Sequence, residues 1–182
     1  MSNLPMASVL RLSTLRARIL TLRHNRSLSS TSANKSKNRI YPAPIRREDE
    51  FQTLTLISAS SRVPLLTFWM TTWCQSCKVI LPTLQSLIEN DGIGEEQGGV
   101  SLVQVEMDSP DLGGITGLGM KYGINSIPSL LAFDRQEPQL ETKISRLDEL
   151  KNKDFLVKWI ENEAARHGQG GAGGSLFRLF GR

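Results

Sequence analysis

The sequence predicts an α/β fold in which a central mixed β-sheet is flanked by helices on both faces. Three observations lead to this prediction. A nearly continuous apolar run, VPLLTFWM at 63–70, is typical of a strand that is buried on both faces. Helical patterns precede and follow this run. Strand and helix patterns then continue to alternate along the chain, as they do in domains that pack helices on a sheet.

The helices are predicted from apolar residues that recur on one face. The first runs from 48 to 59, and the second from 77 to 90, after the apolar strand. A short helix ending at Gly123 and a last helix over about 152–166 follow. The expected buried positions are Phe51, Leu54 and Ile57 in the first helix, Ile80, Leu84, Leu87 and Ile88 in the second, and Phe155, Leu156, Trp159 and Ile160 in the last.

Three further strands complete the predicted sheet. Residues 100–108 alternate between apolar and polar side chains, which is typical of a half-buried strand. Residues 129–134 and 140–145 are predicted as strands separated by a turn around Pro138. The element order is therefore α, β, α, β, short α, β, β, α.

Charge divides the chain into a basic N-terminal segment and an acidic remainder. Residues 1–47 hold ten of the 22 Lys and Arg residues and no acidic residue, since Glu48 is the first. The remainder holds the other twelve basic residues and all 18 acidic ones, which gives it a net charge of −6. We therefore expect no nucleic-acid partner, because such a partner needs a basic surface on the folded part.

Residues 1–35 are predicted to be a mitochondrial transit peptide. If this segment is helical, Leu12, Leu15, Ile19 and Leu22 form an apolar stripe with arginines near its edges. An amphipathic segment that is rich in Arg and Ser and lacks acid is typical of such peptides. A basic tail that binds acidic partners is the alternative. We expect the matrix rather than the intermembrane space, because no apolar run is long enough to span a membrane.

Two further segments flank the predicted domain at 48–167. Residues 36–47 are interpreted as a linker, because Pro42 and Pro44 disfavour regular structure. Residues 168–182 form a Gly-rich tail with a short apolar end. This tail is either disordered without function or a peptide that docks on a partner or a membrane surface.

The only two cysteines, Cys74 and Cys77, lie between the end of the buried strand and the start of a helix. Unpaired backbone N–H groups and the helix dipole favour an anion at a helix N-terminus, so the pKa of the Cys74 thiol is expected to fall. Because the thiolate is the attacking species in disulfide exchange, Cys74 is the expected nucleophile. Cys77, one turn further on, is the expected resolving thiol.

Other interpretations of the cysteine pair remain open on these grounds alone. A structural zinc site needs four ligands, and the two histidines, His24 and His167, are both distant in sequence from the cysteines. We expect no complete metal site within one chain. Copper(I) held by two thiolates, a metal site shared across a dimer, and two buried structural thiols are the alternatives.

The segment from about Glu48 to Arg166 resembles the thioredoxin family. WCQSCK at 73–78 is similar to that family's W-C-x-x-C-K motif, and Pro82 matches the proline in its active-site helix. MKYGINSIPSLLAFD at 120–134 resembles the family segment that carries a cis-proline. The resemblance implies a thioredoxin-like fold with a cis Ile127–Pro128 bond against the cysteines. It also implies that Trp73, Ile127 and Pro128 contact the substrate polypeptide.

The sequence departs from the family at three places near the motif. The residues between the cysteines are Gln75 and Ser76 rather than Gly-Pro. The family's buried aspartate, which assists proton transfer at the second cysteine, is replaced by Thr67 or Phe68, depending on a one-residue gap. The lysine that accompanies this aspartate is replaced by Gln104. These departures predict slower or differently tuned exchange than a general disulfide reductase performs.

The resemblance therefore implies a thiol–disulfide oxidoreductase that needs no bound cofactor. Its partners would be proteins with reactive cysteines or disulfides, together with a reductase or oxidant that recycles the pair. The competing interpretation is a thioredoxin fold that serves as an interaction module or redox sensor with little reductase activity. The missing buried carboxylate favours this alternative, and the intact motif and Ile-Pro segment oppose it.

Overall fold

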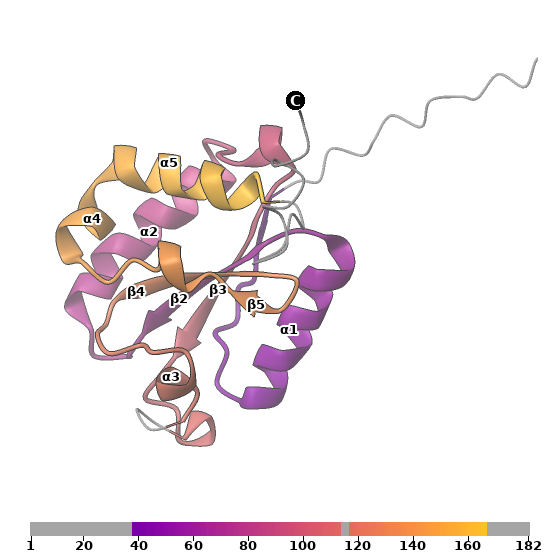
Figure 1. Ribbon diagram of the computed structural model, residues 1–182. Helices are drawn as coiled ribbons and strands as arrows, with labels where there is room; N and C mark the ends of the chain where they lie inside the picture. Colours follow the sequence, from indigo (N-terminus) through magenta and orange to yellow (C-terminus); the bar gives the residue numbers. More distant parts are fainter. Residues whose placement is uncertain (1–37, 114–116, 167–182) are drawn as a thin grey trace, which may run out of the picture. The chain divides into compact units, whose positions relative to one another are not determined.

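The computed structural model describes residues 38–113 and 117–166, and every statement below concerns these residues. All of them lie in the unit Ser32–Arg182. The predicted transit peptide and the predicted tail lie outside the described residues. The strands and helices are β1 (Arg39–Ile40), α1 (Glu48–Ser61), β2 (Leu65–Met70), α2 (Gln75–Glu89), β3 (Ser101–Glu106), α3 (Leu118–Lys121), β4 (Ser129–Asp134), β5 (Glu137–Pro138), α4 (Leu147–Lys151) and α5 (Lys153–Ala164) (Figure 1).

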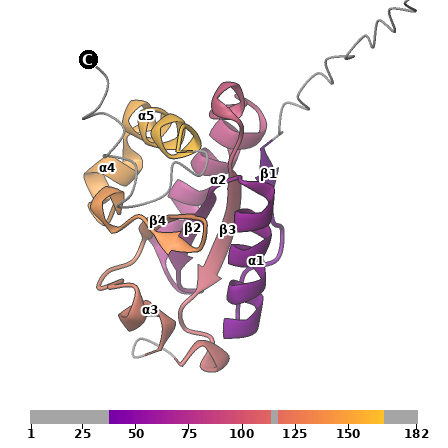
Figure 2. The ribbon, with the colours of Figure 1, turned by 45° about the vertical axis from the view of Figure 1, so that its right-hand side comes forward.

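The strands form one mixed sheet in the order β1-β3-β2-β4-β5 (Figures 1 and 2). β2 lies at its centre, parallel to β3 and antiparallel to β4. Within this register Phe68 of β2 is paired with Gln104 of β3 and with Leu130 of β4. The predicted mixed sheet with helices on both faces is confirmed.

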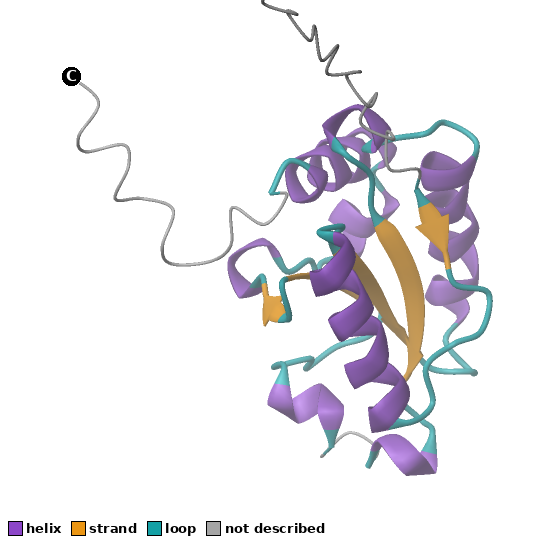
Figure 3. Ribbon diagram, turned by 90° about the vertical axis from the view of Figure 1, so that its right-hand side faces the viewer, coloured by secondary structure: helices purple, strands orange, loops and turns teal. Residues whose placement is uncertain are grey.

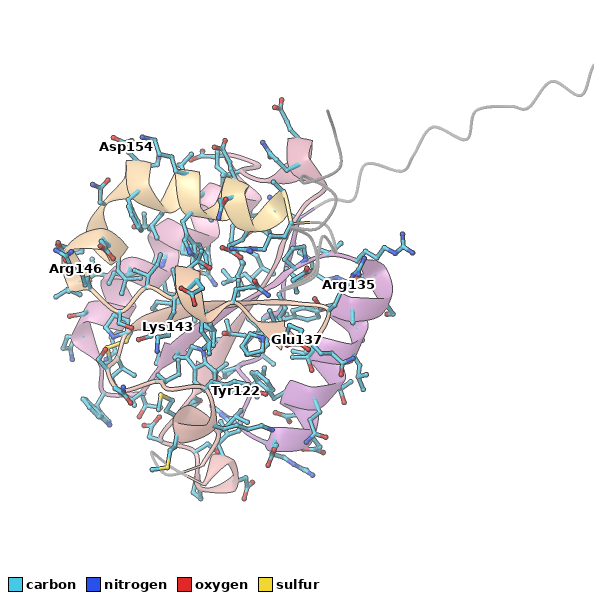
Figure 4. All side chains as sticks on the ribbon, viewed as in Figure 1. Tyr122, Arg135, Glu137, Lys143, Arg146 and Asp154 are labelled. Carbon is cyan, nitrogen blue, oxygen red and sulfur yellow. A yellow bond between two sulfur atoms is a disulfide. The ribbon has the colours of Figure 1, made fainter. Side chains whose placement is uncertain are left out.

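Helices lie on both faces of the sheet (Figure 3). The sheet separates two hydrophobic cores, because alternate residues of its strands point to opposite faces. One core packs α2 and α5 on the face that carries Phe68. The other packs α1 and α3 on the face that carries Trp69. Burying each large apolar side chain stabilises the fold by roughly 1.5–3 kcal/mol. The second core contains an aromatic cluster of Phe51, Trp69, Tyr122 and Phe133 (Tyr122 is labelled in Figure 4).

Helix α2 positions the cysteine pair at its N-terminus. It begins at Gln75, two residues earlier than predicted, with Cys74 as its N-cap. The helix continues through Pro82 to Glu89, and its predicted apolar face, Ile80, Leu84, Leu87 and Ile88, is buried as expected. This burial anchors the helix over the centre of the sheet and so fixes the cysteines at the end of β2.

The segment predicted as a linker is part of the sheet. Arg39 and Ile40 form the edge strand β1, which pairs with the start of β3, and Ile45 forms a further bridge to Val105. Pro42 and Pro44 interrupt the pairing between these two points. These prolines favoured the interpretation as a linker, although the residues on either side of them pair with β3.

The alternation predicted for β3 is confirmed from Val103 onward: Val103, Val105 and Met107 are buried, whereas Gln104 and Glu106 are half-buried. At the start of the strand, Ser101 and Leu102 are both buried.

The predicted strand at 140–145 is wrong. The hairpin turns at Arg135 and Gln136, both with positive φ, so β5 pairs directly with the end of β4 and stops at Pro138. Two-residue turns with two left-handed residues usually contain Asn or Gly, so Arg135 and Gln136 carry no local signal for this turn. Residues 140–142 form a single 3-10 turn instead, and Ile144 makes one bridge to Leu130.

Two predicted helical faces also differ from the structure. In α1 the buried residues are Phe51, Thr55 and Ser58, and Ile57 is 40% exposed. The predicted last helix is α5, in which Leu156, Trp159 and Ile160 are buried as expected but Phe155 is exposed. The short helix α4 directly before it was not predicted. No helix in the described part of the chain is long and apolar enough to cross a bilayer.

Candidate active site

The two cysteines are joined by a disulfide at the start of α2. Their sulfur atoms are 2.09 Å apart and their Cα atoms 5.3 Å apart. The Sγ of Cys74 accepts a hydrogen bond of 3.1 Å from the N–H of Cys77, so the first turn of the helix directs a donor at this sulfur. Cys74 is 6% exposed and Cys77 is 1% exposed. Of the two cysteines, Cys74 is therefore the more exposed residue, and it is the one at the helix N-terminus.

A short turn connects β2 to the disulfide. The N–H of Cys74 donates to the carbonyl of Thr71 at 3.2 Å, which closes the turn after the strand ends. The adjacent Thr72 is fixed by Asp108, which follows β3: the Thr72 hydroxyl donates to Asp108 at 2.6 Å and its N–H at 3.1 Å. Because β2 and β3 are parallel, their carboxyl ends meet at the same edge of the sheet, and this contact links the two ends.

Asp108 is held as a carboxylate at this edge. Desolvation acts to raise its pKa, but the hydrogen bonds from the Thr72 hydroxyl and N–H, together with the nearby Arg46, outweigh it, so the pKa of Asp108 is lowered. Arg46 itself is ion-paired with Glu106 at 2.8 Å. This bond is the main reason that the pKa of Arg46 is raised. Sequence reasoning missed Asp108, although its position directly after a parallel strand is a signal for such a site.

The segment before β4 brings the predicted substrate-contact residues to the same region. The Ile127–Pro128 peptide bond is cis, as the resemblance implied. Pro128 is buried, whereas Ile127 is half-buried and packs against the core that contains both cysteines. Trp73 is 67% exposed and lines one pocket together with Ile127. The structure therefore brings Trp73, Ile127 and the cysteines together.

Comparison with known proteins agrees with this geometry. The thioredoxin family model matches residues 44–162. The chain belongs to the thioredoxin family. It is 27% identical over 103 residues to a thioredoxin of Rickettsia bellii, which covers 56% of this chain and 83% of the relative. It is 32% identical over 101 residues to a thioredoxin of Staphylococcus saprophyticus, with coverages of 56% and 82%.

A solved structure supports the fold alone. A mutant thioredoxin from Halobacterium salinarum superimposes with a TM-score of 0.51 at 18% identity, and the match covers 71% of this chain and 94% of that one. Membership of the thioredoxin family, together with the C-x-x-C disulfide, makes this chain a thiol–disulfide oxidoreductase. The predicted enzyme class is confirmed.

The structure decides which residue takes the place of the thioredoxin aspartate. Phe68 lies in the same core as Cys74 and Cys77 and is fully buried. Thr67 points to the opposite face, where its hydroxyl donates to Leu131 and accepts a bond from the Trp69 indole. Gln104, paired with Phe68 on a parallel strand, lies on the cysteine side of the sheet. The buried ion pair of the family is therefore replaced by a phenyl ring and a neutral amide.

Hydrogen bonds from the segment after β5 hold the cis-proline loop. Lys143 donates through its Nζ to the carbonyl of Gly123 (Lys143 is labelled in Figure 4). The hydroxyl of Ser129 contacts both the Ser126 carbonyl at 2.7 Å and the Ser145 hydroxyl at 3.2 Å. These residues were not identified from the sequence, since contacts between two loops leave no local pattern.

Metal ligation has no support among the described residues. Within residues 38–113 and 117–166 no three His, Cys, Asp or Glu side chains gather in a way that could hold a metal ion. Both cysteines are engaged in the disulfide. His24 and His167 lie outside the described residues.

Proposed function

We propose that this protein exchanges disulfides with protein substrates, with Cys74 as the nucleophile and Cys77 as the resolving thiol. The observation that carries the proposal is the position of the Cys74 sulfur, which caps α2 and accepts the Cys77 N–H. In the reduced protein the same donor and the helix dipole stabilise a thiolate at Cys74. The greater exposure of Cys74 favours attack from this sulfur.

The exchange proceeds through one mixed disulfide. The Cys74 thiolate attacks one sulfur of the substrate disulfide, and the other substrate sulfur leaves as a thiolate that takes up a proton. The Cys77 thiolate then attacks the Cys74 sulfur, which re-forms the Cys74–Cys77 disulfide and releases the second substrate thiol. The substrate gains two electrons and two protons from the protein dithiol. A dithiol or flavin-dependent reductase restores the dithiol, and the reverse sequence oxidises a substrate dithiol.

Trp73, Ile127 and Pro128 position the substrate chain. The exposed Trp73 and the half-buried Ile127 present apolar surface on one side of the disulfide. Backbone groups beside the cis bond pair with an extended substrate segment in the manner of an added strand. These contacts hold the attacked sulfur near Cys74.

The experiment combines activity with trapping. The full chain is assayed for reduction of insulin disulfides, alongside Cys74→Ser and Cys77→Ser. Wild-type protein reduces insulin, and both variants lose turnover. Only Cys77→Ser accumulates mixed disulfides with substrate, because it keeps the nucleophile and lacks the resolving thiol. Equal trapping by Cys74→Ser would overturn the assignment of the two roles.

A second candidate is an interaction module or redox sensor with little turnover. The replacement of the buried carboxylate by Phe68 favours it, because no acid or base at this position can move a proton to or from Cys77. Undetectable insulin reduction without trapping, combined with partner binding that depends on the oxidation state, would support this function over the first.

The proposed site of action is the mitochondrial matrix. Its support is the acid-free, Arg-rich N-terminal sequence with an apolar helical stripe. A fluorescent protein fused behind residues 1–40 should co-localise with a matrix marker. A fusion that stays diffuse in the cytosol would overturn the proposal.

A further inference from the structure

A pocket of about 450 Å³ lies next to Trp73, between the segment that follows β2, the end of β3 and the loop that precedes β4. Its apolar walls come from Trp73, Met107, Ile124 and Ile127. Trp73 is adjacent to Cys74 in the chain, and Ile127 is adjacent to Pro128. A polypeptide attached to Cys74 therefore has its neighbouring side chains within reach of this pocket.

The pocket carries one charged side chain. Among its lining residues only Asp108 is ionisable, and the bonds from Thr72 that lower its pKa keep it an anion at neutral pH. The carboxylate is exposed, and its two oxygens together accept more hydrogen bonds than Thr72 supplies. It can therefore take donors from a ligand without giving up Thr72.

The charges around Asp108 leave this corner of the molecule negative. Arg46, the cation that acts on Asp108, is bound to Glu106 at 2.8 Å. Glu50 is also close to Arg46, and its carboxylate accepts hydrogen bonds from the backbone N–H groups of Arg46 and Arg47. One positive and three negative side chains therefore meet here, so a cation is attracted and an anion repelled.

The pocket wall also holds a polar atom without a partner. The Oγ1 of Thr71 is buried and makes no hydrogen bond, although Thr71 lines the pocket. This oxygen is closed to solvent, so the polar side chains of the lining that a ligand can meet are the exposed Asp108, Asn125 and Ser126. The pocket therefore combines one carboxylate and two neutral polar side chains with the apolar walls.

We propose that this pocket binds an arginine or lysine side chain of the substrate polypeptide, next to the disulfide that Cys74 attacks. Such side chains combine an apolar stem with a cationic end, which matches apolar walls with a single carboxylate. A guanidinium has five N–H donors, more than one carboxylate accepts, and the exposed side-chain oxygens of Asn125 and Ser126 offer further acceptors. The inference rests on the proposed disulfide exchange and specifies its substrates as proteins with a basic residue flanking the reactive cysteine.

The test compares peptide disulfides that differ only in charge. In one set, each peptide carries a single arginine at one of the positions that flank the reactive cysteine. In the matched set, citrulline, the uncharged analogue of arginine, replaces that arginine. The full-length protein, reduced beforehand, is assayed for the second-order rate of reduction of each peptide. At its best position the arginine peptide should react about fivefold faster than its citrulline counterpart, as expected for a partly exposed ion pair. The ratio should fall towards one at high salt.

Two variants locate the charge that produces this preference. Asp108→Asn keeps the shape of the side chain and an acceptor for Thr72, and should bring the arginine-to-citrulline ratio close to one. Asp91→Asn removes a carboxylate beyond the other end of α2, where it pairs with Lys153, and should leave the ratio unchanged. A wild-type ratio near one, or a ratio that Asp108→Asn does not change, would overturn the inference.

A binding measurement separates the pocket from the exchange reaction. Peptides with serine in place of cysteine are titrated into the oxidised protein while amide resonances are followed. The arginine peptide should shift the resonances of Thr71 and Asp108, and the citrulline peptide should shift them at higher concentration only. Selective binding without reduction of any peptide would contradict the proposed function but not the pocket. Reduction without charge preference and without these shifts would contradict the pocket alone.

Discussion

Phe68 of β2 is paired with Gln104 of β3 on the face of the sheet that packs against the Cys74–Cys77 disulfide. This pair occupies the place where the thioredoxin resemblance implies a buried aspartate and its lysine. Because both residues changed, neither a lone carboxylate nor a lone ammonium group is left in the core, where an unpaired charge is costly. The arrangement supports packing rather than proton transfer beside Cys77.

Phe68→Asp is expected to destabilise the protein by about 3–5 kcal/mol, because it removes a fully buried ring and introduces a polar group without a partner. Adding Gln104→Lys should recover at least ~0.5 kcal/mol, since residues in contact couple. Urea denaturation of wild type, both single variants and the double variant measures this coupling. Additive effects would show that the two side chains do not meet.

The sequence predicted the centre of the fold well and its edges poorly, for physical reasons. An apolar run such as β2 has a strong signal because both of its faces are buried. The Arg135–Gln136 turn has no such signal, since its residues adopt positive φ without Asn or Gly. The short strand β1 was hidden by Pro42, which interrupts pairing without abolishing it.

Within the candidate site, the sequence indicated the residues that belong to a motif and missed those that act across loops. Cys74 and Cys77 followed from their spacing, and the cis bond at Pro128 followed from the resemblance alone. The bond between Thr72 and Asp108 depends on two parallel strands ending side by side, which requires the register. Register also decided between Thr67 and Phe68, because a shift of one residue moves a side chain to the other face.

Trp73→Ala should separate stability from substrate contact. Trp73 is 67% exposed, so its removal should change the free energy of unfolding by less than about 0.5 kcal/mol. Reduction of a protein disulfide should slow by roughly tenfold, as for an aromatic anchor at an interface. Reduction of a small disulfide such as hydroxyethyl disulfide should change little. Leu56→Ala, which removes an exposed side chain on α1, is the control and should leave both rates unchanged.

Thr72→Val should raise the pKa of Asp108 towards its ordinary value, because it removes the hydroxyl donor and keeps the backbone N–H. A carboxyl group whose pKa is lowered by folding stabilises the protein at pH values above its unfolded pKa. This stabilisation is lost as the pH falls through the pKa of the folded state. The wild type should therefore lose more stability than Thr72→Val as pH falls below about 4. Arg46, which acts on Asp108, and its neighbours Glu106 and Glu50 are the same in both proteins, so the comparison isolates the hydroxyl.

The pKa of Asp108 can be followed directly by the chemical shift of its carboxyl carbon, and the stability by urea denaturation at a series of pH values. An unchanged pKa in Thr72→Val would mean that the N–H bond and Arg46 are sufficient to hold the carboxylate.

Arg166→Met should be the most damaging single change at the end of α5. Glu163 is fully buried, and its two carboxylate oxygens accept bonds of 2.6 and 3.1 Å from the Arg166 guanidinium. Removing the arginine leaves a buried charge without its partner and should destabilise the protein by about 3–5 kcal/mol. Lysine at this position should be only a partial substitute, because it cannot make the two parallel bonds.

The double variant Glu163→Gln with Arg166→Met provides the control, because it removes both charges together. It should be more stable than Arg166→Met, since a neutral amide is less costly to bury than an unpaired carboxylate. Thermal unfolding of the two variants measures the difference. If Arg166→Met unfolds at the same temperature as the double variant, the carboxylate of Glu163 does not depend on Arg166. The stability of α5 then comes from the packing of Leu156, Trp159 and Ile160 against the sheet and α2.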